Sequence, residues 1–190
     1  IGFALKDVAE NFVAGILLLI QQPFDIGDAI EVAGYAGTVT DIKVRDTTLR
    51  SWEGLLVIIP NAKVYTQVIT NYSRLEKRRL SLEITVDYET DLSTAQNTIL
   101  EVVTQLPGII TDTPAPTLVF NEFADNGIKA TLYYWYDAQK TSYWTALDDA
   151  VKGIKTALEQ ADIHIPRGTY ILQSPSPPPD HSTDSLDESP

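Results

Sequence analysis

The sequence predicts an α+β protein: an N-terminal helix, a small β-barrel, a ferredoxin-like βαββαβ domain and a disordered tail. Three patterns support this prediction. The first segment is hydrophobic with helical spacing, a Gly-punctuated run of short strands follows, and strand and helix patterns then alternate. We expect boundaries at residues 1–21, 22–78, 79–173 and 174–190. A chain of 190 residues is long enough for two small domains with their own cores.

The first segment has the pattern of an amphipathic helix. Its uninterrupted apolar run, residues 12–20, is shorter than the roughly 20 residues that span a bilayer. Charges within such a segment usually face a water-filled lumen or an interface. The alternative is a core helix of a soluble domain. Because the chain contains no methionine, we expect it to continue from a longer protein. The apolar residues at mostly helical spacing are Phe3, Leu5, Val8, Phe12, Ile16 and Leu19.

Short β-rich runs follow Pro23, which cannot continue a helix. Strands are predicted at residues 29–32, 39–50, 55–59 and 68–72, with a turn of helix starting at Pro60-Asn61. Val39 is out of phase with Ile42 in the second run, so we expect a β-bulge there. Strongly bent strands of this length are typical of a small barrel.

The next segment alternates strands and helices. Residues 80–88 alternate apolar and polar side chains, and residues 117–123 and 128–136 form a hairpin across Asp125-Asn126-Gly127. The last strand fragments are predicted at 163–165 and 169–172, which completes the βαββαβ order.

Two helices belong to this segment. Ser93 and Gln96 are expected to form a capping box at the start of the first one. The tail beyond residue 173 is rich in Ser, Pro and acidic residues and cannot form a core. The predicted apolar stripes are Ala95, Ile99, Val102, Val103 and Leu106 in the first helix, and Trp144, Leu147, Val151, Ile154 and Leu158 in the second.

Composition excludes several functions. The formal charge is −12, and residues 79–173 carry six basic and thirteen acidic side chains, which argues against a nucleic-acid partner. With no cysteine and two histidines, thiolate zinc sites and multi-histidine metal cages are excluded. We therefore expect no metal and no cofactor.

No catalytic constellation emerges either. His164 has no carboxylate partner nearby in sequence. The alternating acids Asp87, Glu89 and Asp91 lack the Gly-centred loop of a calcium site. No glycine loop is followed by Lys-Ser/Thr, so a phosphate-cradling loop is absent from the sequence. We predict no catalytic residues and no enzymatic activity.

Several motifs follow one another in order along the first part of the chain. They are Gly2 to Gly15, Pro23-Phe24-x-x-Gly27-Asp28-x-Ile30-x-Val32, Gly37-x-Val39-x-x-Ile42, Thr47-Thr48-x-Arg50, Ile59-Pro60-Asn61 and Asn71-Tyr72-Ser73-Arg74. In this order and spacing they resemble the small-conductance mechanosensitive channel (MscS-like) family. The similarity is densest over residues 23–74 and continues more weakly through 79–172.

The resemblance implies a homoheptamer of identical subunits in the cell's inner or plasma membrane. In this family each subunit contributes a pore-lining helix, an Sm-like β domain and an αβ domain, which together enclose a cytoplasmic vestibule. The implied function is tension-gated release of ions and small solutes on hypo-osmotic shock, with membrane lipids as further partners. Most of this segment would lie on the cytoplasmic side.

The resemblance also implies roles for eight residues of the first helix. Phe3 would supply the apolar side chain at the narrowest point of the pore, and Gly2, Lys6 and Asp7 would also line the pore. Rings of apolar side chains contributed by several subunits can close a pore by dewetting. Asp7 stands where the family often has glycine, at the helix kink. The contact and kink residues would be Leu5, Val8, Asn11 and Gly15, and Asn11 is expected to hydrogen-bond the β domain.

Two other classes of function stay open at this point. One is a soluble Sm-like oligomeric module that binds a ligand or RNA, and the other is an oligomeric scaffold that does not conduct. For the channel, we predict that the acidic charge of residues 79–173, repeated around a vestibule, disfavours small anions.

Overall fold

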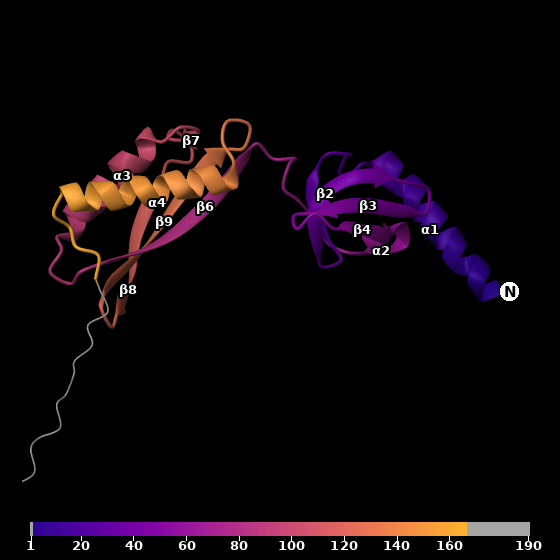
Figure 1. The fold of residues 1–190 in the computed structure, drawn as a ribbon, viewed down its shortest axis with the longest axis horizontal. Coiled ribbons are helices and arrows are strands. Elements are labelled where there is room, and N and C mark those ends of the chain that lie inside the picture. The colour runs from indigo at the N-terminus through magenta and orange to yellow at the C-terminus, as the bar shows by residue number, and fades with distance from the viewer. Residues whose placement is uncertain (1, 167–190) are drawn as a thin grey trace, which may run out of the picture.

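The computed structural model describes residues 2–166 of the chain, and side chains from residue 6 onward. It confirms the α+β class: Figure 1 shows two lobes, each built on one sheet, joined by residues 72–76. The predicted tail, and the strand expected at 169–172, lie outside the described residues.

The chain begins with helix α1, Gly2–Gln21. Gln22 ends it in a left-handed conformation with φ of 45°, and its N–H still donates to the Leu18 carbonyl at 2.8 Å. Pro23 follows directly and disfavours the helical conformation for the residue before it. One face of α1, formed by Ala14, Gly15 and Leu18, is buried against the first lobe.

The first lobe is a five-stranded antiparallel sheet in the order β4-β3-β2-β1-β5. It encloses one core, to which Leu18, Phe24, Leu49 and Val64 contribute. Within the described chain β4 and β5 stand at the two ends of this order and do not pair with each other, so each leaves one edge free. The elements are β1 (Ala29–Val32), β2 (Tyr35–Ile42), β3 (Asp46–Ser51), β4 (Leu56–Pro60), α2 (Asn61–Thr66) and β5 (Ile69–Asn71).

The predicted β-bulge is confirmed, because the register of β2 against β3 shifts between Val39 and Asp41. The single long strand predicted at 39–50 is wrong. A tight turn divides it into β2 and β3, closed by the Lys43 N–H donating to the Asp46 carbonyl at 2.8 Å. This turn has no Gly or Pro to mark it, and its Val44 side chain is exposed.

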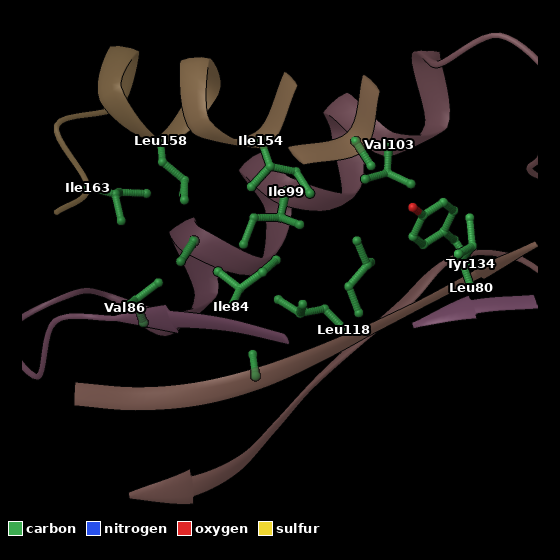
Figure 2. Close-up of a cluster of buried hydrophobic side chains, with 14 of the residues drawn as sticks. Leu80, Ile84, Val86, Ile99, Val103, Leu118, Tyr134, Ile154, Leu158 and Ile163 are labelled. Carbon is green, nitrogen blue, oxygen red and sulfur yellow. The ribbon is translucent and has the colours of Figure 1, made fainter. Parts of the chain in front are cut away.

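The second lobe packs two helices on one face of an antiparallel sheet (Figures 1 and 2). Central strand β9 pairs with β6 along one side and with β7 and β8 along the other. Ile99, Leu132, Tyr134 and Leu158 are among the fully buried side chains between the layers. The elements are β6 (Lys77–Val86), α3 (Leu92–Gln105), β7 (Ile109–Ile110), β8 (Thr117–Ala124), β9 (Gly127–Asp137) and α4 (Tyr143–Gln160).

The strand predicted at 163–165 is not formed. These residues are irregular, although Ile163 is buried against the core and the Asp87 N–H donates to the His164 carbonyl at 3.2 Å. A single hydrogen bond of this kind does not make a ladder. The described order is therefore that of a ferredoxin-like domain up to α4, with the extra two-residue strand β7.

Two helix predictions in this lobe need correction. Asp91, rather than a Ser93–Gln96 box, caps α3, because its carboxylate accepts from the Thr94 N–H at 2.7 Å. In α4 the buried stripe begins at Ala146 and Ala150, whereas the predicted Trp144 and Val151 are exposed. Alanine is a small apolar residue, so a stripe that begins with alanines is not recognised from the spacing of large apolar side chains.

Candidate functional site

The candidate site is the first helix and the surface of the β domain beneath it. Asn11 links the two: its Oδ1 accepts from the Ala62 N–H at 3.0 Å, at the start of α2. Its Nδ2 donates to the Asp7 carbonyl at 2.8 Å, one turn earlier in α1. The predicted hydrogen bond from Asn11 to the β domain is thus present, and it satisfies one of the free N–H groups of α2.

Gly15 lies one turn further along α1, at its closest approach to the β domain. A Cβ atom at this position would overlap the Val44 carbonyl oxygen and lie 2.6 Å from the Asn61 Nδ2. The backbone approach therefore requires glycine, although the helical conformation itself does not.

Asn61 is the buried polar group under this contact. It is 0% exposed, and its Nδ2 donates to the Lys43 carbonyl while its Oδ1 accepts from the Thr47 hydroxyl, both at 2.8 Å. A buried amide with satisfied partners holds its neighbours in one geometry. Asn61 thereby joins α2, β3 and the turn at Lys43 into the surface on which Gly15 rests. Its role was not predicted, although Pro60-Asn61 was among the motifs.

The remaining faces of α1 carry apolar side chains without a partner in the described chain. Val8 is 47% exposed and Ile20 is 73% exposed. Scattered apolar residues are common on surfaces, but a contiguous set along one helix marks an interaction surface. The exposed large side chains of this helix are Val8, Phe12, Val13, Ile16, Leu19 and Ile20.

The charged residues of α1 lie near its start. Lys6 pairs with Glu10 one turn later at 3.6 Å, and both side chains are largely exposed. Asp7 is exposed and, with Val8, lines a shallow groove of about 350 Å³ that Arg45 borders from the β domain. The structure thus brings Asp7, Val8 and Asn11 together at one groove. Gly2, Phe3 and Leu5 lie in α1, but their side chains are outside the described residues.

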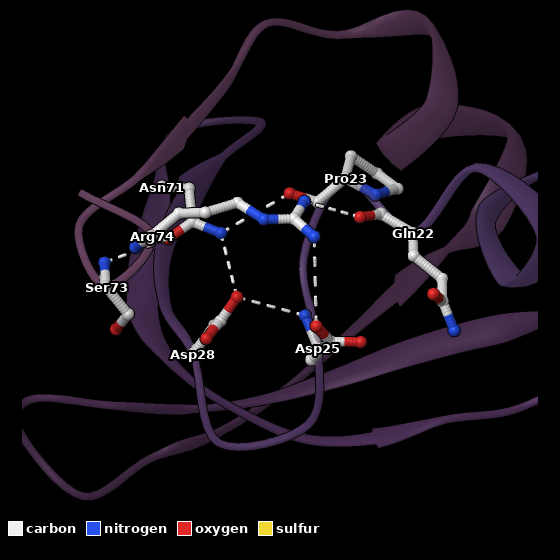
Figure 3. A network of polar contacts seen from close by, with 7 residues as sticks. All are labelled: Gln22, Pro23, Asp25, Asp28, Asn71, Ser73 and Arg74. Atoms are coloured by element: carbon white, nitrogen blue, oxygen red, sulfur yellow. Dashed lines mark hydrogen bonds and ion pairs between the residues drawn. The ribbon is translucent and has the colours of Figure 1, made fainter.

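A second polar network fixes where the chain leaves α1 (Figure 3). The Asp28 carboxylate accepts from the Asp25 N–H at 3.0 Å and from the Asn71 Nδ2 at 2.8 Å. Arg74 donates to the Gln22 carbonyl at 2.5 Å and lies 3.9 Å from the Asp25 carboxylate. These bonds connect the residues that follow α1 to the end of β5. Asp28 and the Asn71–Arg74 motif therefore have a structural role here.

Comparisons with known proteins agree with this architecture. Residues 7–74 match the family model of the mechanosensitive ion channel β-domain. Residues 80–165 match that of the C-terminal domain of the mechanosensitive ion channel MscS.

Two curated relatives match most of the chain. An uncharacterized MscS family protein of Archaeoglobus fulgidus is 32% identical over 87% of this chain and 58% of its own length. A small-conductance mechanosensitive channel of Edwardsiella ictaluri is 30% identical over 87% of this chain and 57% of its own. The chain thus spans a little over half the length of these relatives.

A solved structure is also similar. The crystal structure of Helicobacter pylori MscS in a closed state superposes with a TM-score of 0.82 at 26% identity, covering 92% of this chain and 68% of that one.

The fold and the two matched domains define the C-terminal portion of a mechanosensitive channel subunit. The chain belongs to the MscS-like family. Among residues 2–166, no helix is both long and apolar enough to cross a membrane.

Proposed function

We propose that this chain forms the lower pore and vestibule of a tension-gated membrane channel that releases ions and small solutes on hypo-osmotic shock. The channel is a homoheptamer in the inner or plasma membrane, with most of this segment on the cytoplasmic side. Membrane lipids and the permeating solutes are its other partners.

One observation carries the proposal. Helix α1 is attached to its own β domain along a single face, through Asn11, Gly15 and Leu18, while its other apolar side chains stay exposed. A helix that served as the core of one globule would bury those side chains. An exposed apolar helix standing on a folded base supports packing against equivalent helices and lipid.

The residue assignments extend this proposal. Phe3 forms the apolar constriction, with Gly2, Lys6 and Asp7 at the pore and with Leu5 and Val8 against the tension-sensing helices. Asn11 and Gly15 hold the lower half of α1 to the β domain. Because Asp7 replaces a glycine common in the family, the helix kinks less readily, and inactivation is weaker than in relatives with glycine.

Residues 1–190 contain no cysteine, so once any cysteine elsewhere in the full-length protein is replaced by serine, an introduced thiol can report on the pore. We expect Phe3→Cys in the full-length protein, reconstituted in liposome patches, to retain tension-activated currents. A bulky thiol reagent applied at tension should then reduce the conductance, because a group added at a constriction narrows the passage.

Ser93→Cys is the matched control, since Ser93 is exposed on α3 in the other lobe. It should react without any change in conductance. Equal effects at both positions, or an unmodified current at Phe3→Cys when mass spectrometry shows full reaction, would place Phe3 outside the pore.

A further inference from the structure

A recess lies where the two lobes meet, around the side chain of Arg78. Its volume is about 340 Å³. The walls come from the start of β1, the segment after β5, the start of β6, and the stretch from the end of β9 to the first residue of α4. None of the roles proposed above uses this recess.

Arg78 is a partly buried cation that has no anionic partner in the part of the chain that the structure describes. Its guanidinium carbon lies 5.2 Å from the ring centroid of Tyr72, 5.8 Å from that of Tyr136 and 6.0 Å from that of Tyr143. Within the described residues its guanidinium forms no ion pair, and its contact with the neighbouring Tyr136 hydroxyl falls short of hydrogen-bond geometry. Aromatic faces attract the charge but leave the directional N–H donors unused.

Tyr136 supplies a second unused group in the same recess. The residue is 1% exposed, yet its hydroxyl has no hydrogen-bond partner among the described residues. Buried polar atoms of native proteins are nearly always paired, so an unpaired one calls for an explanation. Burial raises the pKa of this hydroxyl above its ordinary value, although the neighbouring Arg78 guanidinium opposes that shift.

The start of α4 borders the recess as well. Thr141, Ser142 and Tyr143 all line it, and Ser142 is the N-cap of this 18-residue helix. The first turn of a long helix carries partial positive charge and free N–H groups. Three independent features therefore favour a negatively charged group at the same place.

We propose that this recess binds the carboxylate group of a small organic acid. The Arg78 guanidinium and the Tyr136 hydroxyl donate hydrogen bonds to the carboxylate, and the tyrosine rings contact the carbon skeleton of the acid.

The charge of the recess indicates which anion it takes. The Glu76 carboxylate also lines it, accepting from the Gln139 Nε2 at 2.8 Å. With one basic and one acidic side chain in the wall, the recess suits a monoanion. A monoanion paired with Arg78 leaves no excess charge, whereas a phosphate dianion would keep one uncompensated charge beside Glu76 and lose more hydration on binding. The proposal is independent of whether the chain conducts ions.

The test is calorimetric titration of the full chain with sodium acetate and sodium propionate, with sodium chloride and sodium phosphate as comparison salts at constant ionic strength. We expect saturable binding of the two carboxylates only. Arg78→Gln should weaken it about tenfold or more, since charge-assisted hydrogen bonds are lost.

Arg79→Gln is the control for charge. It removes the same charge from the next residue of β6, whose side chain lies over Tyr133, 5.2 Å from the ring centroid, and does not line the recess. Binding to this variant should stay within about twofold of the wild type, because only long-range attraction changes.

Tyr136→Phe separates ligand binding from folding. It should weaken carboxylate binding without lowering the melting temperature, because the hydroxyl forms no hydrogen bond of ordinary geometry among residues 2–166. Any of four results would overturn the proposal: no saturable carboxylate binding, equal binding of phosphate or chloride, equal weakening by Arg78→Gln and Arg79→Gln, or unchanged binding to a folded Tyr136→Phe.

Discussion

At the scale of single residues, the contact between α1 and the β domain depends on two small features. Asn11 provides the hydrogen bond to the Ala62 N–H, and Gly15 provides the room for close approach. The resemblance drew attention to both positions and implied the hydrogen bond of Asn11 to the β domain. Asn61 was not predicted as their support, because its partners are backbone and side-chain atoms distant in sequence.

Gly15→Ala tests this contact, because its effect on the free energy of unfolding should have the opposite sign to the effect in an exposed helix. In an exposed helix, alanine in place of glycine stabilises by about 1 kcal/mol. Here the added methyl group meets the backbone carbonyl of Val44, which cannot move aside. We expect a net loss of about 1–3 kcal/mol in the free energy of unfolding, measured by urea titration. A gain in stability would show that α1 does not rest on the β domain at this point.

At the scale of elements, the sequence predicted most strands, and the failures have identifiable causes. The Asp125-Asn126 turn and the alternation in β6 are local signals, and both were recognised. The break between β2 and β3 lacks turn residues, so only the pairing of the two strands shows it. The N-terminal half of the α4 stripe was missed because its core residues are alanines.

The N-cap of α3 gives a pH-dependent test at this scale. Hydrogen bonds from Thr94 lower the pKa of Asp91 below its ordinary value, so the charged form is favoured in the folded protein. Its stabilisation is present above the ordinary pKa, near 4, and is lost as pH falls through the lowered one.

Asp91→Asn keeps a capping side chain but cannot titrate. We expect the stability of the wild type relative to this variant to decline as the pH is lowered below about 4, in urea titrations at a series of pH values. A difference that stays constant over this range would show that the Asp91 carboxylate does not act as the cap.

At the scale of the whole molecule, charge and assembly decide the function. Composition predicted the acidic second lobe, but a single chain contains no information on how many copies surround a passage. The exposed face of α1 and the free edges β4 and β5 are surfaces that other copies can cover.

The acidic charge leads to a prediction on ion preference. Residues 79–173 carry seven more acidic than basic side chains, and the proposed ring of subunits would repeat this charge. We expect the reversal potential of the full-length channel in a salt gradient to show that small anions are disfavoured, more strongly at low ionic strength. A clear preference for anions would contradict the prediction that the acidic charge of residues 79–173 acts on the ions that pass through the vestibule.

The assembly itself is tested by the mass of the full-length protein extracted in mild detergent, measured by native mass spectrometry. A channel in which α1 lines a shared passage predicts a single species of seven identical subunits. A monomer or dimer that persists across gentle detergents would contradict it, because neither can surround a pore.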